Sequence, residues 1–457
     1  MCLQVFSRII LFVGITVLSV SCNSQKNEFI MVMNETRVSF SEKNHALDNN
    51  DNFSPCDRFL CYDTRGTVYN ENLANCKSIE KVEVGTGRET VLWEPESVTG
   101  EEAAPGVAAV SWHPAEDKVI FIHGPLLSEV EERGYYGIRN RTGVEVSVDG
   151  TGKTTKIDCR DVSTEGPTLP GAHRGGTHRH EYSRNGNRIG FTYDDFLLPQ
   201  FDRTIGYMEP NDTAPEGYTH YFAVLLKPSE TGKSKPGEIE KAYGDSWVDP
   251  AGTMRAFIGK ARSENGVDYD TALFVADVPK DVDVTSAYSG DKDNYPKPPE
   301  GVKIRRLTYG LTVHGIVRGS PDGSKIAFLA EDENRIKQAF IIDSRSTESN
   351  LNTENHFRQV SRFTSGASFI RWHPSGNWVF AVVYGNIAAL YTGEDENFGT
   401  TLWLTNDEKE RAELVVSNNG NMLAYNMLVP DKTGTRLYKQ IFVLELEPGS
   451  KKLVSFK

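Results

Sequence analysis

The chain has 457 residues and a net charge of −13, and apolar and charged residues make up 38% and 25% of it. These proportions are ordinary for a folded globular protein. The acidic balance argues against a general nucleic-acid binder, which needs a basic surface. A small anionic ligand is not excluded, because its binding depends on local charge.

The first 21 residues predict an export signal. Arg8 supplies a basic flank, and residues 9–20 form an apolar run of about 12 residues, which is too short to span a membrane stably. Small residues then precede Cys22, as at the cleavage site of a bacterial lipoprotein, although a leucine stands one position early for the commonest form. We expect either a lipid anchor on Cys22 or a plain secreted protein.

From residue 51 onward, one phrase recurs seven times: polar turn residues are followed by a short apolar β run. The copies stand at 54–62, 112–121, 183–191, 248–257, 320–328, 373–380 and 417–425. Their spacing of about 44 to 71 residues fits one four-stranded sheet per copy with variable loops. The polar stretch, here called the turn phrase, suits the turn between the innermost strand of a blade and the next strand. The sequence therefore predicts an all-β fold, a seven-bladed β-propeller.

The predicted organisation is an export signal over 1–21, a polar tether over 22–50 and the propeller over 51–457. One apolar run at 29–33 predicts a strand within the tether that helps to close the ring. The blades are expected near 53–93, 107–160, 177–228, 245–308, 314–362, 367–405 and 412–456. No helix with capping signals interrupts the pattern.

Four cysteines follow Cys22, and they leave two alternatives open. Cys61 and Cys76 can meet across a hairpin of the first blade, and an exported protein permits disulfides. Free, partly buried thiols, with Cys56 and Cys159 among them, are the equally weighted alternative. No cysteine spacing suits a zinc finger.

The geometry of a propeller predicts on which of its two faces each histidine lies. Residues shortly before a turn phrase, and residues just after the second strand of a blade, meet at the channel opening opposite the turn phrases. His113 and His373 lie inside turn phrases and are interpreted as turn residues. His178 and His180 lie before the third turn phrase, two apart on a predicted strand, so we expect their side chains to share a face.

Two imidazoles on one strand face are typical of half a metal site, because neutral histidine is the commonest metal ligand. The sequence thus predicts His178 and His180 as ligands of a divalent metal of the Mn or Ca type. A hydrogen-bonded pair in a loop is the alternative. His123, Tyr193 and His314 are expected at the same opening and are the candidate catalytic residues.

Basic charge is concentrated in one part of the acidic chain. Residues 139–188 hold nine basic residues, seven of them arginines, against six acidic ones. Arginine binds carboxylates bidentately, so an anionic ligand is expected here; pairing with neighbouring acids is the alternative. The predicted anion-binding residues are Arg139, Arg141, Arg174, Arg179, Arg203 and Arg318. No phosphate loop, serine-nucleophile elbow or Cys/His protease pattern is found.

Several segments together resemble a bacterial family of unknown function, the DUF3748 group, which is related to the TolB-like propellers. These segments are 106–114, 119–124, 141–143, 158–162, 174–180 and 202–206. The resemblance covers about residues 50 to 430, and it implies the propeller fold without implying an activity.

A more distant similarity is to the oligogalacturonate lyases, carried by residues 180–186, where His-Glu stands before a turn phrase. Those seven-bladed propellers bind a manganese-type ion with histidines and a glutamine, and a histidine base cleaves uronate-containing oligosaccharides by β-elimination. The similarity implies a ligand role for His180 and His178. The glutamine and the base have no clear counterpart, so His123 and His314 remain candidates.

Two functions are therefore expected from the sequence. The first is an exported, metal-assisted lyase of acidic oligosaccharides or polysaccharides, facing the periplasm or the surface of a bacterial outer membrane and touching the membrane only through its lipid anchor. The second is a non-catalytic, TolB-like propeller that binds a protein or cell-wall partner in the envelope. Neither involves nucleic acid.

Overall fold

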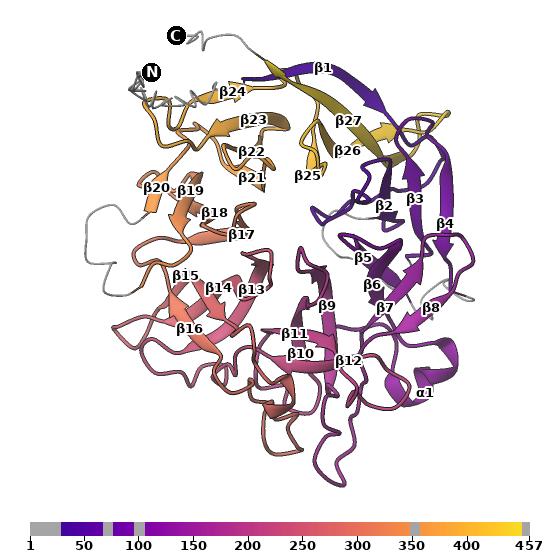
Figure 1. The fold of residues 1–457 in the computed structure, drawn as a ribbon, viewed down its shortest axis with the longest axis vertical. Helices are drawn as coiled ribbons and strands as arrows, with labels where there is room; N and C mark the ends of the chain where they lie inside the picture. The colour runs from indigo at the N-terminus through magenta and orange to yellow at the C-terminus, as the bar shows by residue number, and fades with distance from the viewer. Residues whose placement is uncertain (1–28, 67–75, 96–105, 348–356, 450–457) are drawn as a thin grey trace, which may run out of the picture.

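The computed structural model describes residues 29–66, 76–95, 106–347 and 357–449, so the export signal and Cys22 lie outside the described residues. The described strands form seven antiparallel sheets around a central channel (Figure 1). The predicted seven-bladed, all-β propeller is confirmed. No helix among the described residues is long and apolar enough to cross a membrane.

The strands are numbered along the chain and run outward from the channel within each blade. Blade 1 contains β2 (Phe59–Asp63), β3 (Ile79–Glu83) and β4 (Glu89–Trp93), and blade 2 contains β5 (Val107–Trp112), β6 (Lys118–His123), β7 (Thr142–Ser147) and β8 (Thr154–Lys156). Blade 3 contains β9 (Gly175–Tyr182), β10 (Ile189–Asp195), β11 (Thr204–Pro210) and β12 (His220–Val224), and blade 4 contains β13 (Ile239–Trp247), β14 (Met254–Arg262), β15 (Tyr269–Asp277) and β16 (Lys303–Arg306). Blade 5 contains β17 (Val313–Gly319), β18 (Lys325–Glu331), β19 (Lys337–Asp343) and β20 (Phe357–Gln359), and blade 6 contains β21 (Ala367–Trp372), β22 (Trp378–Val383), β23 (Asn386–Tyr391) and β24 (Thr401–Trp403). Blade 7 contains β25 (Ala412–Val416), β26 (Met422–Pro430), β27 (Leu437–Gly449) and β1 (Phe29–Arg37).

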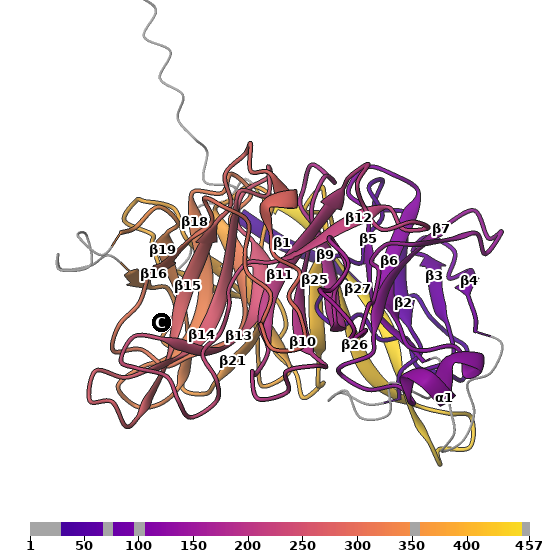
Figure 2. The same cartoon turned by 90° about the horizontal axis from the view of Figure 1, so that it is seen from below.

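Helical structure in the described chain is confined to short turns. The α-helix α1 (Val130–Arg133) follows the 3-10 turn η2 (Leu127–Glu129) in the loop between β6 and β7, and a second 3-10 turn, η3 (Val284–Ser286), follows β15. Figure 2 shows the ring edge-on, with α1 on the face where the β26–β27 hairpin also projects. This is the face opposite the turn phrases.

The ring is closed by the N-terminal strand. β1 pairs antiparallel with β27, from Phe29 opposite Gly449 to Arg37 opposite Phe442. The outermost strand of the last blade thus comes from the start of the chain, as the apolar run at 29–33 predicted. Within the range expected to be a tether, residues 29–37 form a strand of blade 7, and Val38 and Leu47 are buried in the cluster between blades 7 and 1.

Ion pairs fix β1 to blade 7. The Glu35 carboxylate accepts hydrogen bonds from the Arg411 guanidinium at 2.7 and 2.9 Å and from the Tyr425 hydroxyl at 2.5 Å, and it pairs with Lys409. Burial raises the pKa of Glu35, but the hydrogen bonds from Lys409, Tyr425 and Arg411 outweigh it and lower the pKa overall. The closing strand is therefore held by a charge that must stay ionised.

Apolar clusters hold neighbouring blades together face to face. One cluster joins Ile205 and Tyr207 of blade 3 to Phe257 and Phe274 of blade 4, and all four side chains are buried. Sheets packed in this way bury both of their faces, which explains the near-continuous apolar runs of the middle strands. Cys61 and Cys76 lie in the cluster between blades 1 and 2 as free, buried thiols, and burial raises the pKa of both.

The turn phrases also contact one another around the ring. The His113 ring lies in its turn, where Nδ1 accepts a hydrogen bond from the backbone N–H of Glu116 at 2.9 Å. Gly186, in the turn phrase of the next blade, has a φ of +76°, and a Cβ there would come within 2.6 Å of His113 Nε2. The interpretation of His113 as a turn residue is confirmed, and the glycine of one turn makes room for the histidine of the preceding one.

The innermost strands of blades 2 to 7 share a β-bulge. The register of β5, β9, β13, β17, β21 and β25 with the second strand of the blade shifts near the middle. In each of these strands one residue at the register shift has a positive φ. In chain order these residues are Ala109, Arg179, Gly244, Gly315, Phe369 and Glu413. A bulge bends and twists a strand, so these strands curve around the channel. It also changes which side chains share a face.

We predict that Glu35→Gln lowers the free energy of unfolding by about 1–3 kcal/mol at pH 7.5, because Arg411 loses its charged partner. The folded-state pKa of Glu35 is lowered, so the difference from wild type shrinks as the pH falls below 4.5. Urea denaturation at pH 7.5 and pH 4 measures both effects. Glu447→Gln on the exposed end of β27 is the control, and an equal loss in both variants contradicts the closing role of Glu35.

Candidate functional site

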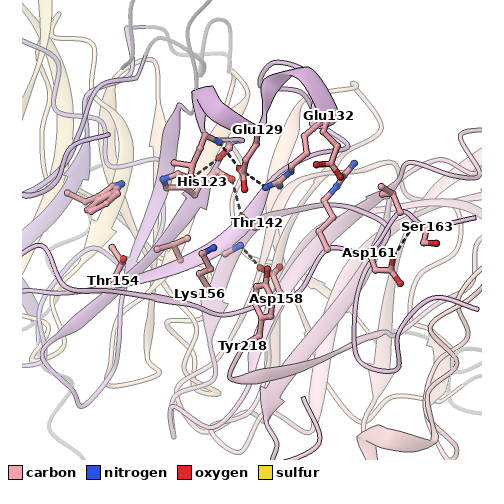
Figure 3. A pocket seen from close by; sticks show the side chains of 18 residues that line it. His123, Glu129, Glu132, Thr142, Thr154, Lys156, Asp158, Asp161, Ser163 and Tyr218 are labelled. Atoms are coloured by element: carbon pink, nitrogen blue, oxygen red, sulfur yellow. Dashed lines mark hydrogen bonds and ion pairs between the residues drawn. The ribbon is translucent and has the colours of Figure 1, made fainter. Parts of the chain in front are cut away.

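A cavity of about 660 Å³ lies beside the outer strands of blade 2 (Figure 3). We call it the interblade cavity, because Trp93 of blade 1 and Tyr218 of blade 3 contribute to its wall. The other lining side chains come from the end of β6, the α1 turn, β7, β8 and residues 158–163. β6 starts at a turn phrase and ends at His123, so the cavity lies toward the face opposite the turn phrases.

Asp158 places a buried carboxyl group in the wall of this cavity. The residue is 1% exposed. Its Oδ1 accepts a hydrogen bond from the Gly143 N–H at 2.7 Å, and its Oδ2 accepts one from the Thr177 hydroxyl at 2.7 Å. These hydrogen bonds lower the pKa of Asp158, but burial outweighs them and raises the pKa to about 6. The group therefore gains and loses its proton close to neutral pH, as acid–base catalysis requires.

Two neutral histidines, His180 and His173, lie near Asp158 on the side of blade 3. The Thr177 hydroxyl donates to Asp158, so it accepts the Nε2–H of His180, at 3.1 Å. His173 Nε2 lies 3.5 Å from Asp158 Oδ2. Burial lowers the pKa of both histidines, to about 3 for His180. Asp158, Thr177 and His180 thus form a hydrogen-bonded chain that leads from the cavity into blade 3.

His123 is a neutral base on the same wall. Its Nδ1–H donates to the Gly124 carbonyl at 2.7 Å, which leaves Nε2 as the lone-pair nitrogen. Burial lowers the pKa of His123, and the charges of Arg133 and Lys156 act in the same direction. Figure 3 shows His123, Lys156 and Asp158 around one space. Of the three candidate catalytic residues of the sequence, His123 is the one that reaches this cavity.

Two cations of the cavity have no carboxylate partner among the described residues. Arg160 donates to the carbonyl oxygens of Gly175 at 3.0 Å and Arg139 at 3.2 Å, and these acceptors carry no charge. Burial and the nearby Arg133 lower the pKa of Arg160 to about 10. Lys156 is exposed on β8 and forms no ion pair within the described part of the chain. Cations without an ion-pair partner favour an anionic ligand, and they do so here beside the carboxylates of Glu129, Glu132 and Asp161, which also line the cavity.

His178 and His180 do not share a face, contrary to the expectation from their spacing. Arg179 between them has a φ of +52°, and the register of β9 with β10 shifts there. The bulge turns His180 toward Thr177, whereas His178 Nε2–H donates to Asp194 Oδ2 at 2.8 Å. Arg141 donates to His178 Nδ1 at 3.0 Å. Both ring nitrogens of His178 are therefore engaged.

These histidines do not fit a metal site. Burial lowers the pKa of His178 to about 3, although its hydrogen bond to Asp194 opposes the shift. Arg141 and Arg203 lie on either side of the His178–Asp194 pair, with Arg203 Nε donating to Asp194 at 2.8 Å. Within the described ranges, no group of three or more His, Cys, Asp or Glu side chains is placed to hold a metal ion.

Tyr193, Arg174 and Arg139 serve the fold rather than the cavity. The Tyr193 hydroxyl is buried and donates to Asp195 Oδ2 at 2.9 Å. Arg174 is fully buried, pairs with Asp195 at 2.7 Å and donates to the Asn294 carbonyl at 3.1 Å, which ties down the long loop after β15. Arg139 donates to the Asp195 carbonyl at 2.8 Å. Their predicted catalytic and anion-binding roles are not supported by these positions.

The remaining predicted residues lie elsewhere. His314 pairs with Glu331 at 2.9 Å within blade 5. Arg179 and Arg318 lie in the central channel, where both donate to the Asn49 carbonyl. The sequence reasoning missed Asp158, Lys156 and Tyr218. Asp158 stands in a segment that resembles the DUF3748 group, but nothing in the local pattern shows that its carboxyl is buried.

Comparisons with known proteins place the chain in a family. Residues 106–220 match the family described as "Protein of unknown function (DUF3748)", and this stretch contains every lining residue of the interblade cavity except Trp93. "Uncharacterized protein YidR" of Escherichia coli strain K12 is 31% identical over 418 residues, which cover 85% of this chain and 94% of that protein.

Solved structures with a similar fold are distant in sequence. A putative TolB from Agrobacterium tumefaciens is 14% identical with a TM-score of 0.35, and covers 78% of this chain and 86% of its own. The TolB of Acinetobacter baumannii is 12% identical with a TM-score of 0.36, over 87% of this chain and 85% of its own. The β-propeller domain of Cps50 (Swd1) from Myceliophteria thermophila is 11% identical with a TM-score of 0.47, over 92% and 100%.

We predict that wild-type protein loses about 2 kcal/mol of stability relative to Asp158→Asn between pH 4 and pH 7.5. The folded-state pKa of Asp158 is raised from 3.8 to about 6, so the stability linked to its proton is full below pH 3.8 and lost as the pH rises through 6. Chemical denaturation of both proteins across this range measures the difference. Asp161→Asn, in the same cavity, is the control; a difference for Asp158→Asn that does not change with pH contradicts the buried, protonatable carboxyl.

Proposed function

The chain belongs to the DUF3748 family, and from that premise we propose that its interblade cavity binds an acidic saccharide and cleaves it by β-elimination. One observation carries the proposal. A neutral histidine, a buried carboxyl with a pKa of about 6 and two cations that form no ion pair with the described residues line one cavity of about 660 Å³. That volume lies within the usual range for small-molecule sites.

The two cations are the reason for proposing an acidic substrate. Lys156 and Arg160 attract the carboxylate of a uronate, and their charge stabilises the negative charge that develops when the neighbouring carbon loses its proton. Trp93 and Tyr218 offer aromatic surface to the apolar faces of sugar rings. The cavity thus combines charge for the carboxylate with flat apolar walls for the ring.

The proton transfers follow from the two titratable groups. The Nε2 lone pair of His123 takes the proton next to the uronate carboxylate, and the electrons of the broken C–H bond form the new C=C bond. The C–O bond on the next carbon breaks, and the leaving oxygen takes a proton from Asp158, which needs its raised pKa for this role. Imidazolium and carboxylate then exchange the proton through solvent, which restores the enzyme.

No step of this proposal passes through a metal ion. The metal-ligand roles expected for His178 and His180 do not fit their contacts, because His178 bonds to Asp194 and His180 bonds to Thr177. The proposal keeps the exported location and the lipid on Cys22, since the apolar run and the small residues before that cysteine support both. An acidic polysaccharide is a substrate that an exported protein meets.

A non-catalytic binding propeller is the second candidate. It is favoured by the hydrogen bonds that already engage both oxygens of Asp158. In that case Asp158 stabilises blade 3, and the same cavity or a blade edge holds a saccharide or an envelope protein without turnover. Turnover and binding therefore have to be measured separately.

We predict that the purified chain without residues 1–22 converts uronate oligosaccharides to unsaturated products, detected by their ultraviolet absorbance. His123→Ala should lower kcat by about 100-fold or more, because a positioned base is lost. Activity should fall above about pH 6, since Asp158 must carry its proton. His314→Ala, in blade 5, is the matched histidine control and should behave as wild type.

We also predict that Lys156→Ala raises KM, or the dissociation constant of an uncleaved uronate, about 10-fold, because one partner of the carboxylate is removed. Arg358→Ala, an exposed arginine of blade 5, is the control. Calorimetric titration separates the two candidate functions. Binding without turnover identifies the binding propeller, and absence of both overturns the assignment of this cavity.

A further inference from the structure

A second cavity, of about 310 Å³, lies where the central channel opens on the face of the turn phrases. We call it the channel-mouth cavity. Pro321 and Pro374 of two turn phrases contribute to its rim, so it opens on the face opposite the interblade cavity. The titratable side chains in its wall are Arg184, Arg318, Arg371, Asp51 and Glu181, besides Tyr182.

Arginines from three innermost strands converge on one backbone carbonyl in the channel. Asn49 O accepts hydrogen bonds from Arg179 at 2.8 Å, from Arg318 at 2.5 Å and from Arg371. Arg371 also donates to the Asn50 carbonyl at 2.6 Å. A carbonyl oxygen is a dipole without net charge, so these bonds satisfy donors and leave the positive charges in place.

Few carboxylates offset these charges. Glu181 accepts from Arg255 at 3.0 Å, and Arg318 approaches it only to 3.4 Å. Asp51 pairs with Arg371 at 3.1 Å, and its side chain is 48% exposed. Two carboxylates, Asp51 and Glu181, therefore line a wall that also holds the guanidinium groups of Arg184, Arg318 and Arg371.

Arg184 adds a further cation at the rim. It donates to the carbonyl oxygens of Gly319 and Ser320 at 3.2 and 3.0 Å and to that of Pro321, and it forms no ion pair among the described residues. The Nε–H groups of Arg318 and Arg371 are buried and find no acceptor in the described part of the chain. Burial, followed by the charges of Arg371 and Arg179, lowers the pKa of Arg318 well below its usual range. Three guanidinium groups thus lie at the channel mouth beside two carboxylates of the wall, and the charges of Asp249 and Asp322 also act on Arg184.

We propose that the channel-mouth cavity is a binding site for a small oxyanion of the phosphate or sulfate class, held by Arg184, Arg318 and Arg371. Guanidinium groups bind such oxyanions with paired hydrogen bonds. A tetrahedral oxyanion is small enough for the volume. Asp51 competes with it, because its carboxylate pairs with Arg371. This site is independent of the proposed saccharide cleavage and lies on the other face.

The sign of the effect at Asp51 makes the proposal testable. Inorganic phosphate, added to the purified chain at constant ionic strength, should raise Tm saturably by about 2–4 °C. Arg184→Gln and Arg371→Gln should weaken phosphate binding about 10-fold or more. Asp51→Asn should strengthen it several-fold, because the competing carboxylate is gone. Isothermal titration with phosphate, then with sulfate, measures both directions.

Controls separate this site from general charge effects. Arg436→Gln removes one exposed arginine from the β26–β27 hairpin. This variant should bind phosphate as wild type does. Arg184 donates only from the rim, so its variant should fold even if Arg371→Gln does not. Unsaturable stabilisation, equal loss in Arg436→Gln, or weaker binding by Asp51→Asn overturns the proposal.

Discussion

Closure of the ring by β1 is the constraint on which the central channel and the packing of the last blade against the first depend. Each sheet buries both faces against its neighbours, so an open ring would expose two apolar faces at the break. The pairing of β1 with β27 removes the break by taking the last strand from the opposite end of the chain. The channel-mouth cavity follows from this geometry, because its wall takes side chains from several blades around the channel, whereas the interblade cavity lies between the consecutive blades 1, 2 and 3.

The two faces of the ring have different chemistry because the chain is organised differently on each. On one face the turn phrases are short and alike, and arginines of the innermost strands approach the channel mouth. On the other face the loops are long and vary, and the loop that holds α1 completes the interblade cavity. A protonatable carboxyl and a neutral imidazole lie there beside cations, whereas the channel mouth holds cations and few acids.

The fold was predictable because its signal is local and repeated: each turn phrase marks one blade, and even the closing strand appears as an apolar run at 29–33. The site was less predictable. Glycines mark the bulges at Gly244 and Gly315 in the sequence, because glycine favours a positive φ. In blade 3 the residue with the positive φ is Arg179, and an arginine does not indicate a bulge. The separation of His178 from His180 was therefore not predictable. The raised pKa of Asp158 likewise arises from burial between blades that are distant in sequence. His123 was found because it ends a second strand, a position that the repeat fixes.

The most direct measurement of the central claim is a crystal structure of the chain with an uncleaved uronate oligosaccharide. The account predicts the uronate carboxylate beside Lys156 and Arg160, with the carbon that loses its proton facing His123 Nε2 and the glycosidic oxygen facing Asp158. A saccharide bound in the channel mouth, or one in the interblade cavity with its carboxylate turned away from Lys156 and Arg160, would contradict it.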